Sequence, residues 1–173
     1  MERDTKLRQA LQRRLLRFPT HTRVRRSIEK ISPLVIIMNK ENTKKLFDDF
    51  PAFWKGKDNP QASLMCFGFE YDDGWFDLTY KLCKDINNYF LTQDARHEIP
   101  DHFCVVQCKE KFGGLRFYIS SAPIEVHNMI DEAAQKSYTI CEKCGAPGKL
   151  RDDLDWWLTL CDKHYKEKKD DKV

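Results

Sequence analysis

The sequence predicts an α+β fold in which helices pack a short antiparallel sheet, followed by a small cysteine-rich module. Segments with a helical spacing of apolar residues predict the helices, and two alternating segments around a glycine pair predict the sheet. A cysteine and histidine array near the C-terminus predicts the module. The chain has 173 residues, which is long enough for one domain and one small module. With 33% charged and 41% hydrophobic residues, its composition is that of a globular protein.

Charge divides the chain into two parts. Residues 1–37 carry ten basic and three acidic groups, for a net charge of +7, whereas residues 38–173 carry 20 basic and 24 acidic groups, for a net charge of −4. In the first part leucines recur every four residues and predict a basic helical extension. Three interpretations stay open: a nucleic-acid arm, a targeting segment, or a dispensable extension ahead of Met38. No apolar segment long enough for a membrane span or an export signal is present.

The first half of the body, which we place at residues 38–138, is expected to hold two helices and a buried extended segment. Asn42-Thr43 can cap a helix that ends at Pro51. Residues 63–71 are rich in apolar side chains and predict an extended segment. The best helix covers residues 75–90, with Asp73 as a candidate cap.

The second half of the body contains the hairpin. Residues 103–110 and 115–120 alternate with period two around Lys111-Phe112-Gly113-Gly114, which predicts two antiparallel strands. Strict alternation places Cys104, Val106 and Cys108 on one face. Pro123 then begins a helix that extends to Tyr138.

The seven cysteines carry the strongest chemical signal, because three of them and one histidine form the array C-x2-C-x16-C-x2-H. Two-residue gaps let each pair of ligands converge on one ion, and thiolate and imidazole together suit a tetrahedral Zn²⁺. We therefore predict one structural zinc ion in a zinc ribbon at residues 139–165, followed by a charged, frayed tail at 166–173. The predicted ligands are Cys141, Cys144, Cys161 and His164.

Between the ligand pairs, residues 149–151 and 156–160 read as two strands around an acidic turn. Trp156 and Trp157 should then point to opposite faces of the second strand. We expect each ring to pack in the protein core. A tryptophan that is exposed instead would be a candidate anchor for a binding partner. The remaining cysteines lack ligand spacing and read as small buried hydrophobic residues: Cys66, Cys83, Cys104 and Cys108.

Several segments resemble a group of small bacterial and bacteriophage zinc-ribbon proteins. They are the stretch Lys109-Glu110-Lys111-Phe112-Gly113-Gly114-Leu115-Arg116-Phe117-Tyr118, the stretch from Leu64 to Glu70, Gly74-Trp75-Phe76, and the ribbon from Cys141 to His164. The resemblance covers about residues 38–165 and implies a prokaryotic or phage protein of the cytoplasm. It attaches no reaction to these motifs, and it makes residues 1–37 look added, because such proteins begin near Met38.

Function is predicted in three versions. The first is a non-enzymatic, zinc-stabilised binding protein, a phage or prokaryotic accessory factor that engages a protein partner, for example to inhibit a host defence system. The second is a nucleic-acid-binding ribbon protein, in which residues 1–37 are the favoured contact with the nucleic acid. Neither version includes a contact with a membrane. The third, an enzyme with acid-base groups in the loop at residues 97–102, is disfavoured because a solvated polar loop explains that pattern better and no paired carboxylates, nucleophile elbow or nucleotide loop supports a named reaction. The candidate partner-binding residues are Lys109, Lys111, Phe112, Arg116, Trp156 and Trp157.

Overall fold

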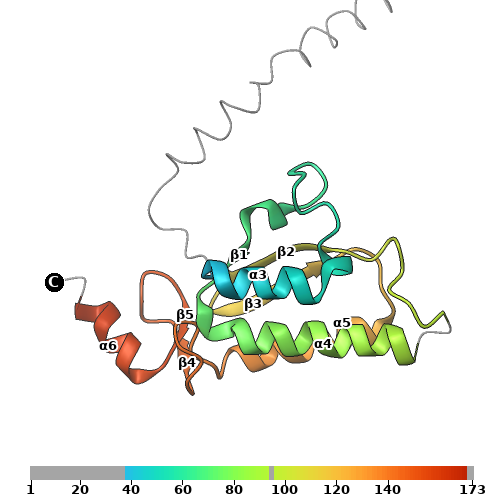
Figure 1. The fold of residues 1–173 in the computed structure, drawn as a ribbon. Coiled ribbons are helices and arrows are strands. Elements are labelled where there is room, and N and C mark those ends of the chain that lie inside the picture. The colour runs from blue at the N-terminus through green and yellow to red at the C-terminus, as the bar shows by residue number, and fades with distance from the viewer. Residues whose placement is uncertain (1–37, 94–95, 171–173) are drawn as a thin grey trace, which may run out of the picture. The chain divides into compact units, whose positions relative to one another are not determined.

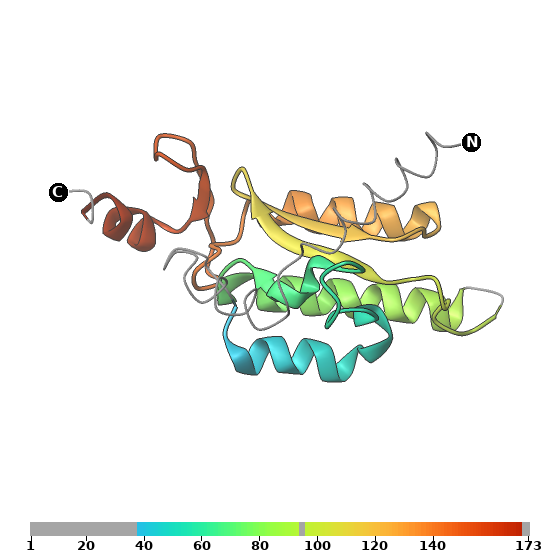
Figure 2. The ribbon, with the colours of Figure 1, turned by 90° about the horizontal axis from the view of Figure 1, so that it is seen from above.

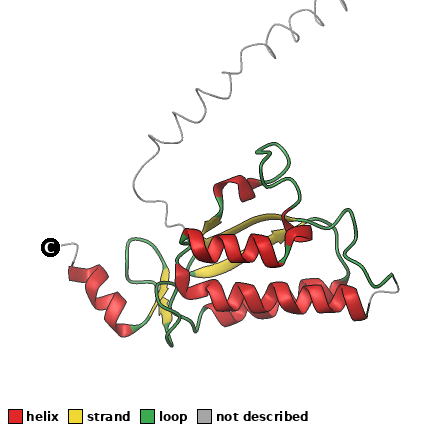
Figure 3. Cartoon of the chain, in the orientation of Figure 1, coloured by secondary structure: helices red, strands yellow, loops and turns green. Residues whose placement is uncertain are grey.

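The structure, a computed structural model, describes residues 38–93 and 96–170; the predicted extension at 1–37 lies outside these residues. The described part has the predicted α+β architecture (Figures 1 and 3). Its elements in chain order are α3 (Lys40–Asp49), η1 (Pro51–Trp54), η2 (Leu64–Phe67), β1 (Phe69–Glu70), η3 (Asp73–Trp75), α4 (Phe76–Thr92), β2 (Val105–Lys111), β3 (Gly114–Ile119), α5 (Ile124–Ser137), β4 (Lys149–Arg151), β5 (Leu158–Leu160) and α6 (Asp162–Asp170).

The main sheet has the order β1-β2-β3 and is mixed rather than purely antiparallel. Strands β2 and β3 form the predicted antiparallel hairpin, while β1 pairs with β2 in parallel. Helix α5 packs on β3 and on α4, and the two helices run in opposite directions (Figure 2). In the segment predicted as extended at 63–71, Leu64–Phe67 instead form the 3-10 turn η2, which Ser63 caps by accepting a hydrogen bond from the N–H of Met65, and only Phe69–Glu70 form a strand.

A β-bulge breaks the alternation expected along β2. Val105 pairs with Ile119 but Gln107 pairs with Tyr118, so the register shifts between these two pairs. The extra residue turns the strand, and Val105 and Cys108 are both buried. The prediction that Cys104, Val106 and Cys108 share one face was therefore wrong.

The helix ends also differ from expectation. The side chain of Asn39, not Asn42-Thr43, caps α3 by accepting from the N–H of Asn42 at 2.8 Å. Asp73 does not cap α4; its carboxylate accepts from the N–H of Asn39 at 2.9 Å and so joins two turns. Helix α6 extends to Asp170, so most of the predicted frayed tail is helical.

The β2–β3 turn is held at Phe112 and Gly113, whose φ angles are 56° and 73°. Two consecutive positive φ values are the signature of the type I′ turn that matches the twist of a two-residue hairpin. Glycine reaches this region without a steric penalty, whereas a bulky residue such as phenylalanine is an outlier there.

Buried side chains form two separate clusters. The larger one lies between the sheet and helices α3 to α5 and is rich in aromatic rings, including Phe53, Trp54, Phe69 and Trp75. The smaller one lies in the C-terminal module and contains Cys141, Leu154, Leu158 and Leu160. Of the four cysteines outside the array, Cys83 and Cys108 are buried as predicted, but Cys66 is exposed and Cys104 only half-buried. No helix within the described ranges is both long and apolar enough to cross a membrane.

Candidate metal centre

The C-terminal module is a short hairpin that brings both ligand pairs to the same end. Strands β4 and β5 pair antiparallel, with Lys149 opposite Leu160 and Arg151 opposite Leu158. The first pair of cysteines precedes β4 in a tight turn, in which the N–H of Gly145 donates to the carbonyl of Cys141 at 2.8 Å. Cys161 directly follows β5, and His164 lies in the first turn of α6.

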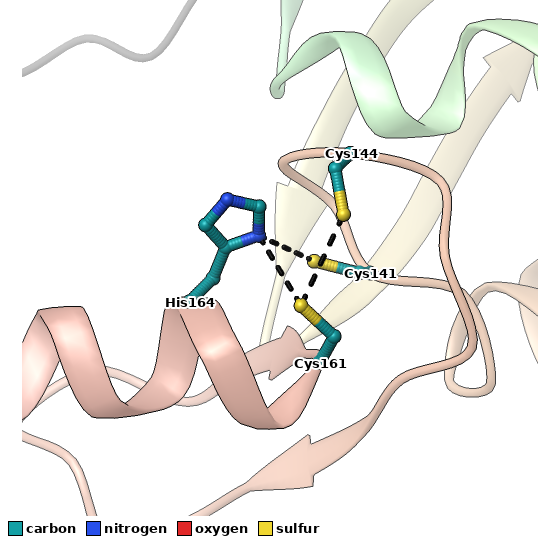
Figure 4. Close-up of side chains that lie close together, drawn as sticks. All are labelled: Cys141, Cys144, Cys161 and His164. Carbon is teal, nitrogen blue, oxygen red and sulfur yellow. Dashed lines mark hydrogen bonds between the residues drawn. The ribbon is translucent and has the colours of Figure 1, made fainter.

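Figure 4 shows that the four predicted ligands point toward one another. The Nδ1 atom of His164 lies 3.3 Å from the Sγ atoms of both Cys141 and Cys161. The Sγ atoms of Cys144 and Cys161 are 3.9 Å apart. All four ligand atoms lie within 4.8 Å of one another, so residues distant in the sequence form a single Cys3His group.

These spacings fit a tetrahedral metal ion. Zinc–sulfur bonds of about 2.3 Å and zinc–nitrogen bonds of about 2.0–2.1 Å put neighbouring ligand atoms about 3.5–3.8 Å apart. Three of the separations, two of 3.3 Å and one of 3.9 Å, bracket that range, and no two ligand atoms are more than 4.8 Å apart. Soft thiolates together with imidazole are the donors that zinc and similar ions prefer. The Cys3His group can therefore hold a metal ion with four protein ligands.

Helix α6 prepares one thiol for metal binding. The carbonyl of Cys161 accepts the N–H of Tyr165 at 3.0 Å, which places Cys161 at the N-cap of the helix. The backbone N–H of His164 is the main cause that lowers the pKa of the Cys161 thiol below its usual value. Burial has the opposite effect on Cys141, whose thiol pKa rises to about 11 without an ion. A cation would reverse that shift by stabilising the thiolate.

The outer nitrogen of the histidine faces a carboxylate. His164 Nε2 lies 3.8 Å from Glu167 Oε2, one turn further along α6. A carboxylate behind a ligating imidazole favours the tautomer that presents the other nitrogen to the metal. Arg151 and Asp162, joined by an ion pair, tie β4 to the first turn of the same helix.

The first ligand pair is seated on the body at η3. The N–H of Gly74 donates to the carbonyl of Glu142 at 2.7 Å, and the indole N–H of Trp75 donates to the carbonyl of Ile140 at 2.9 Å. A Cβ atom at Gly74 would lie only 2.2 Å from the carbonyl oxygen of Cys141. Gly74 is thus a residue of close backbone approach, a role that the sequence analysis missed.

A second set of contacts joins the module to the hairpin tip. The hydroxyl of Thr159 donates to the carbonyl of Gly113 at 2.6 Å. The indole N–H of Trp156 donates to Oε2 of Glu110 at 2.8 Å, and the ring centroids of Phe112 and Trp157 are 6.1 Å apart. The β2–β3 turn and the β4–β5 loop are therefore fixed against each other.

The structure places the six predicted partner-binding residues in different settings. Trp156 and Trp157 precede β5 in the loop instead of lying on a strand, and they are 58% and 47% exposed, so the expectation of core packing was wrong. Phe112 is 52% exposed at the hairpin tip, with the Lys111 ammonium 5.3 Å from its ring. The other two differ: Lys109 lies over the exposed ring of Tyr118, and Arg116 is half-buried and donates to the hydroxyl of Tyr138.

Glu142, between the first two cysteines, is a buried acidic residue that no sequence pattern predicts. Its side chain is 2% exposed, and its Oε2 atom has no hydrogen-bond partner among the described residues. Burial, followed by the nearby carboxylate of Glu110, raises the pKa of Glu142 from 4.5 to about 8. From sequence, a charged residue between metal ligands is expected to face solvent. Glu142 is buried because the module packs against η3.

This burial predicts a pH dependence of folding. Because the pKa of Glu142 is higher in the folded state than its usual value of 4.5, the folded protein binds more protons between about pH 4.5 and 8. Glu142 therefore lowers stability as the pH rises through that window. Glu142→Gln should remove this component and gain on the order of a few kcal/mol at pH 8.5 but little at pH 4.5. Denaturant unfolding of both zinc-loaded proteins across this range measures the difference, and parallel pH profiles would contradict the prediction.

The fold and the site together define an α+β protein with a candidate Cys3His metal centre. The chain matches no model of a known protein family, no curated protein sequence and no solved structure. The resemblance to bacterial and bacteriophage zinc-ribbon proteins therefore stays a prediction.

Proposed function

We propose that this chain is a non-enzymatic binding protein that one structural zinc ion stabilises. The complete Cys3His set carries the proposal: four protein ligands fill a tetrahedral shell and leave no coordination position for a water molecule or a substrate. The ion would act as a scaffold that holds β4, β5 and α6 around a small apolar cluster. A cluster of that size is a weak core by itself, and metals commonly stabilise such modules.

The binding role is supported by what the module holds in place. Phe112, Trp156 and Trp157 are exposed, and large aromatic residues are enriched among the residues that dominate binding energy. We place the contact with a protein partner at these three residues, with Lys109, Lys111 and Arg116 beside them. A phage or prokaryotic accessory factor of the cytoplasm, for example one that inhibits a host defence system, is the version that the resemblance favours.

Nucleic acid is the competing partner. Basic side chains and exposed rings on the hairpin fit stacking and phosphate contacts. Asp152, in the loop that carries the tryptophans, and Glu110, which accepts from Trp156, oppose it, because carboxylates repel phosphates. The charge of the contact region thus favours a protein.

The proposal is tested by affinity capture from bacterial lysate, with and without nuclease. We expect the zinc-loaded protein to retain a protein partner after nuclease treatment and the variant Trp156→Ala/Trp157→Ala to lose it. Phe67→Ala, which removes a 42% exposed ring from η2, is the matched control and should capture normally. Capture that disappears with nuclease would favour the nucleic-acid version, and capture that the double variant retains would overturn the assigned contact.

A further inference from the structure

The strand register separates the two faces of the β2–β3 hairpin. Glu110 pairs with Leu115, whose side chain is buried in the core, so these two residues belong to the core face of the hairpin. Lys109 pairs with Arg116, and both belong to the opposite face, because side chains alternate along a strand. Lys111, two residues after Lys109, lies on that opposite face as well. We call this face the basic face and define it by Lys109, Lys111 and Arg116.

The positive charges of the basic face are not neutralised by neighbouring carboxylates. None of its three cations forms an ion pair with a carboxylate of residues 38–93 or 96–170. Glu110 is directed elsewhere, since its two carboxylate oxygens accept from the N–H of Gly113 at 2.6 Å and from the indole of Trp156 at 2.8 Å. Glu70, on the neighbouring strand β1, accepts from the side-chain amide of Gln107 at 2.8 Å.

Two of the cations stand directly opposite each other, which makes the basic face suited to an anion. Like charges at directly opposite positions of an antiparallel pair, such as Lys109 and Arg116, are destabilising. Arg116 is also held in place, because its guanidinium donates to the carbonyl of Leu115 at 3.0 Å and to the hydroxyl of Tyr138 at 3.3 Å. Arginine has five N–H donors, so further donors remain for a carboxylate. A bound anion would offset the repulsion without having to order the guanidinium first.

Tyr118 distinguishes between two kinds of anion. Its ring is 41% exposed on the basic face, but the Lys109 ammonium lies over it, 5.8 Å from the ring centroid. A nucleotide base that stacked on this side of the ring would have to displace the ammonium and lose its cation–π contact. Binding of a phosphate backbone also relies on contacts to many successive phosphates, whereas the basic face offers three cations. A short segment with two or three carboxylates matches that number.

We infer that the basic face binds an acidic segment of a protein partner, with Asp or Glu side chains of that segment on Lys109, Lys111 and Arg116. The inference rests on the proposed protein-binding function and adds the chemistry of the partner. Charge complementarity carries it, because unpaired cations on one face of a hairpin attract and orient a segment of opposite charge. Trp156 lies on the side of Glu110, so the basic face and the tryptophan contact can be tested by separate substitutions.

Nuclear magnetic resonance titration of the full-length, zinc-loaded protein with a short oligo-glutamate peptide tests the inference. We expect saturable shifts in the signals of Lys109, Arg116 and Tyr118, and no shifts with oligo-glutamine. Signals of single residues keep this binding apart from any binding to residues 1–37, which carry a net charge of +7. At about 1 M salt, where the Debye length is about 3 Å, the shifts at the basic face should disappear.

Two matched double variants test which charges matter. Lys109→Gln/Lys111→Gln removes two of the three cations and should weaken oligo-glutamate binding at Arg116 about three- to tenfold, as expected for exposed ion pairs. Arg116 is kept in these variants because its hydrogen bonds are part of the fold. Lys84→Gln/Lys136→Gln removes the same charge from exposed positions of α4 and α5 and should leave the binding at the basic face unchanged. Thermal melting of both variants checks that they remain folded.

Three results would overturn the inference. They are no shift at the basic face, an equal weakening in both double variants, and tighter binding of single-stranded oligothymidine than of oligo-glutamate at this face, which would favour nucleic acid. If oligo-glutamate does not bind the basic face but lysate capture still depends on Trp156 and Trp157, the acidic partner fails while the proposed function stands.

Discussion

Removal of the metal is expected to unfold the C-terminal module and leave the body folded. The four ligands come from two turns and a helix that are otherwise joined by the small cluster around Leu154, Leu158 and Leu160 and by the ion pair of Arg151 with Asp162. Structural zinc supplies about 10–16 kcal/mol of binding free energy in small zinc domains, and that energy is folding energy. The body has its own aromatic core, which contains none of the ligands. Chelation should therefore abolish hydrogen-exchange protection of the N–H groups of Glu142 and Gly145 but not of those in α4.

Substitution of a single ligand tests the same metal site without a chelator. Cys141→Ser removes a buried ligand and should lower the zinc content well below one ion per chain, at a cost of at least about 3 kcal/mol of stability. Cys66→Ser changes an exposed cysteine outside the site and should keep both zinc and the melting temperature. Elemental analysis and calorimetry measure the two quantities. A Cys141→Ser protein with one bound zinc ion and unchanged melting would show that the Cys3His group is not the metal site.

The parts of the fold that could be predicted are those that depend on local patterns. The leucine stripe of α4, the alternation around Gly113 and the cysteine spacing each arise within a few residues and need no knowledge of distant contacts. The bulge at Val105 could not be predicted, because it is set by how β2 pairs with β3 and by what lies beneath it. The cap at Asn39 is local, because its side chain accepts from the N–H of Asn42 three residues later, whereas the contact of its own N–H with Asp73 spans 34 residues and could not be predicted.

The candidate site divides in the same way. The ligand set follows from spacing alone, whereas the exposure of Trp156 and Trp157 depends on where β5 begins. A strand that started at Trp156 would have buried one of the two rings; the wider loop leaves both outside. The burial of Glu142 depends on the contact between two modules, and hydrophobic patterning carries no signal for such a contact.

Substitution of Gly74 is expected to release the first ligand pair from η3 while leaving the metal bound and the contact with the hairpin tip through Thr159 in place. A Cβ atom at this position would lie 2.2 Å from the carbonyl oxygen of Cys141, 2.4 Å from that of Glu142 and 2.5 Å from the backbone nitrogen of Gly145. All three are backbone atoms, so no side chain can rotate away to make room. Gly74→Ala must therefore break the hydrogen bond from Gly74 to Glu142, and we expect a loss of about 3 kcal/mol or more.

The backbone conformation does not account for that loss, because Gly74 is not among the glycines with positive φ. Gly56→Ala is the matched control: it has a φ of 78°, meets only the Cβ of Ala62 at 3.1 Å, and should cost about 1–2 kcal/mol through strain alone. Zinc content should stay at one ion in Gly74→Ala, since all four ligands lie between residues 141 and 164. The exchange protection of the Trp75 indole N–H, which donates to Ile140, should fall with the docking. Because Glu142 would become solvated, the pH dependence attributed to its burial should vanish in the same variant, and its persistence would show that the module is held to the body by other contacts.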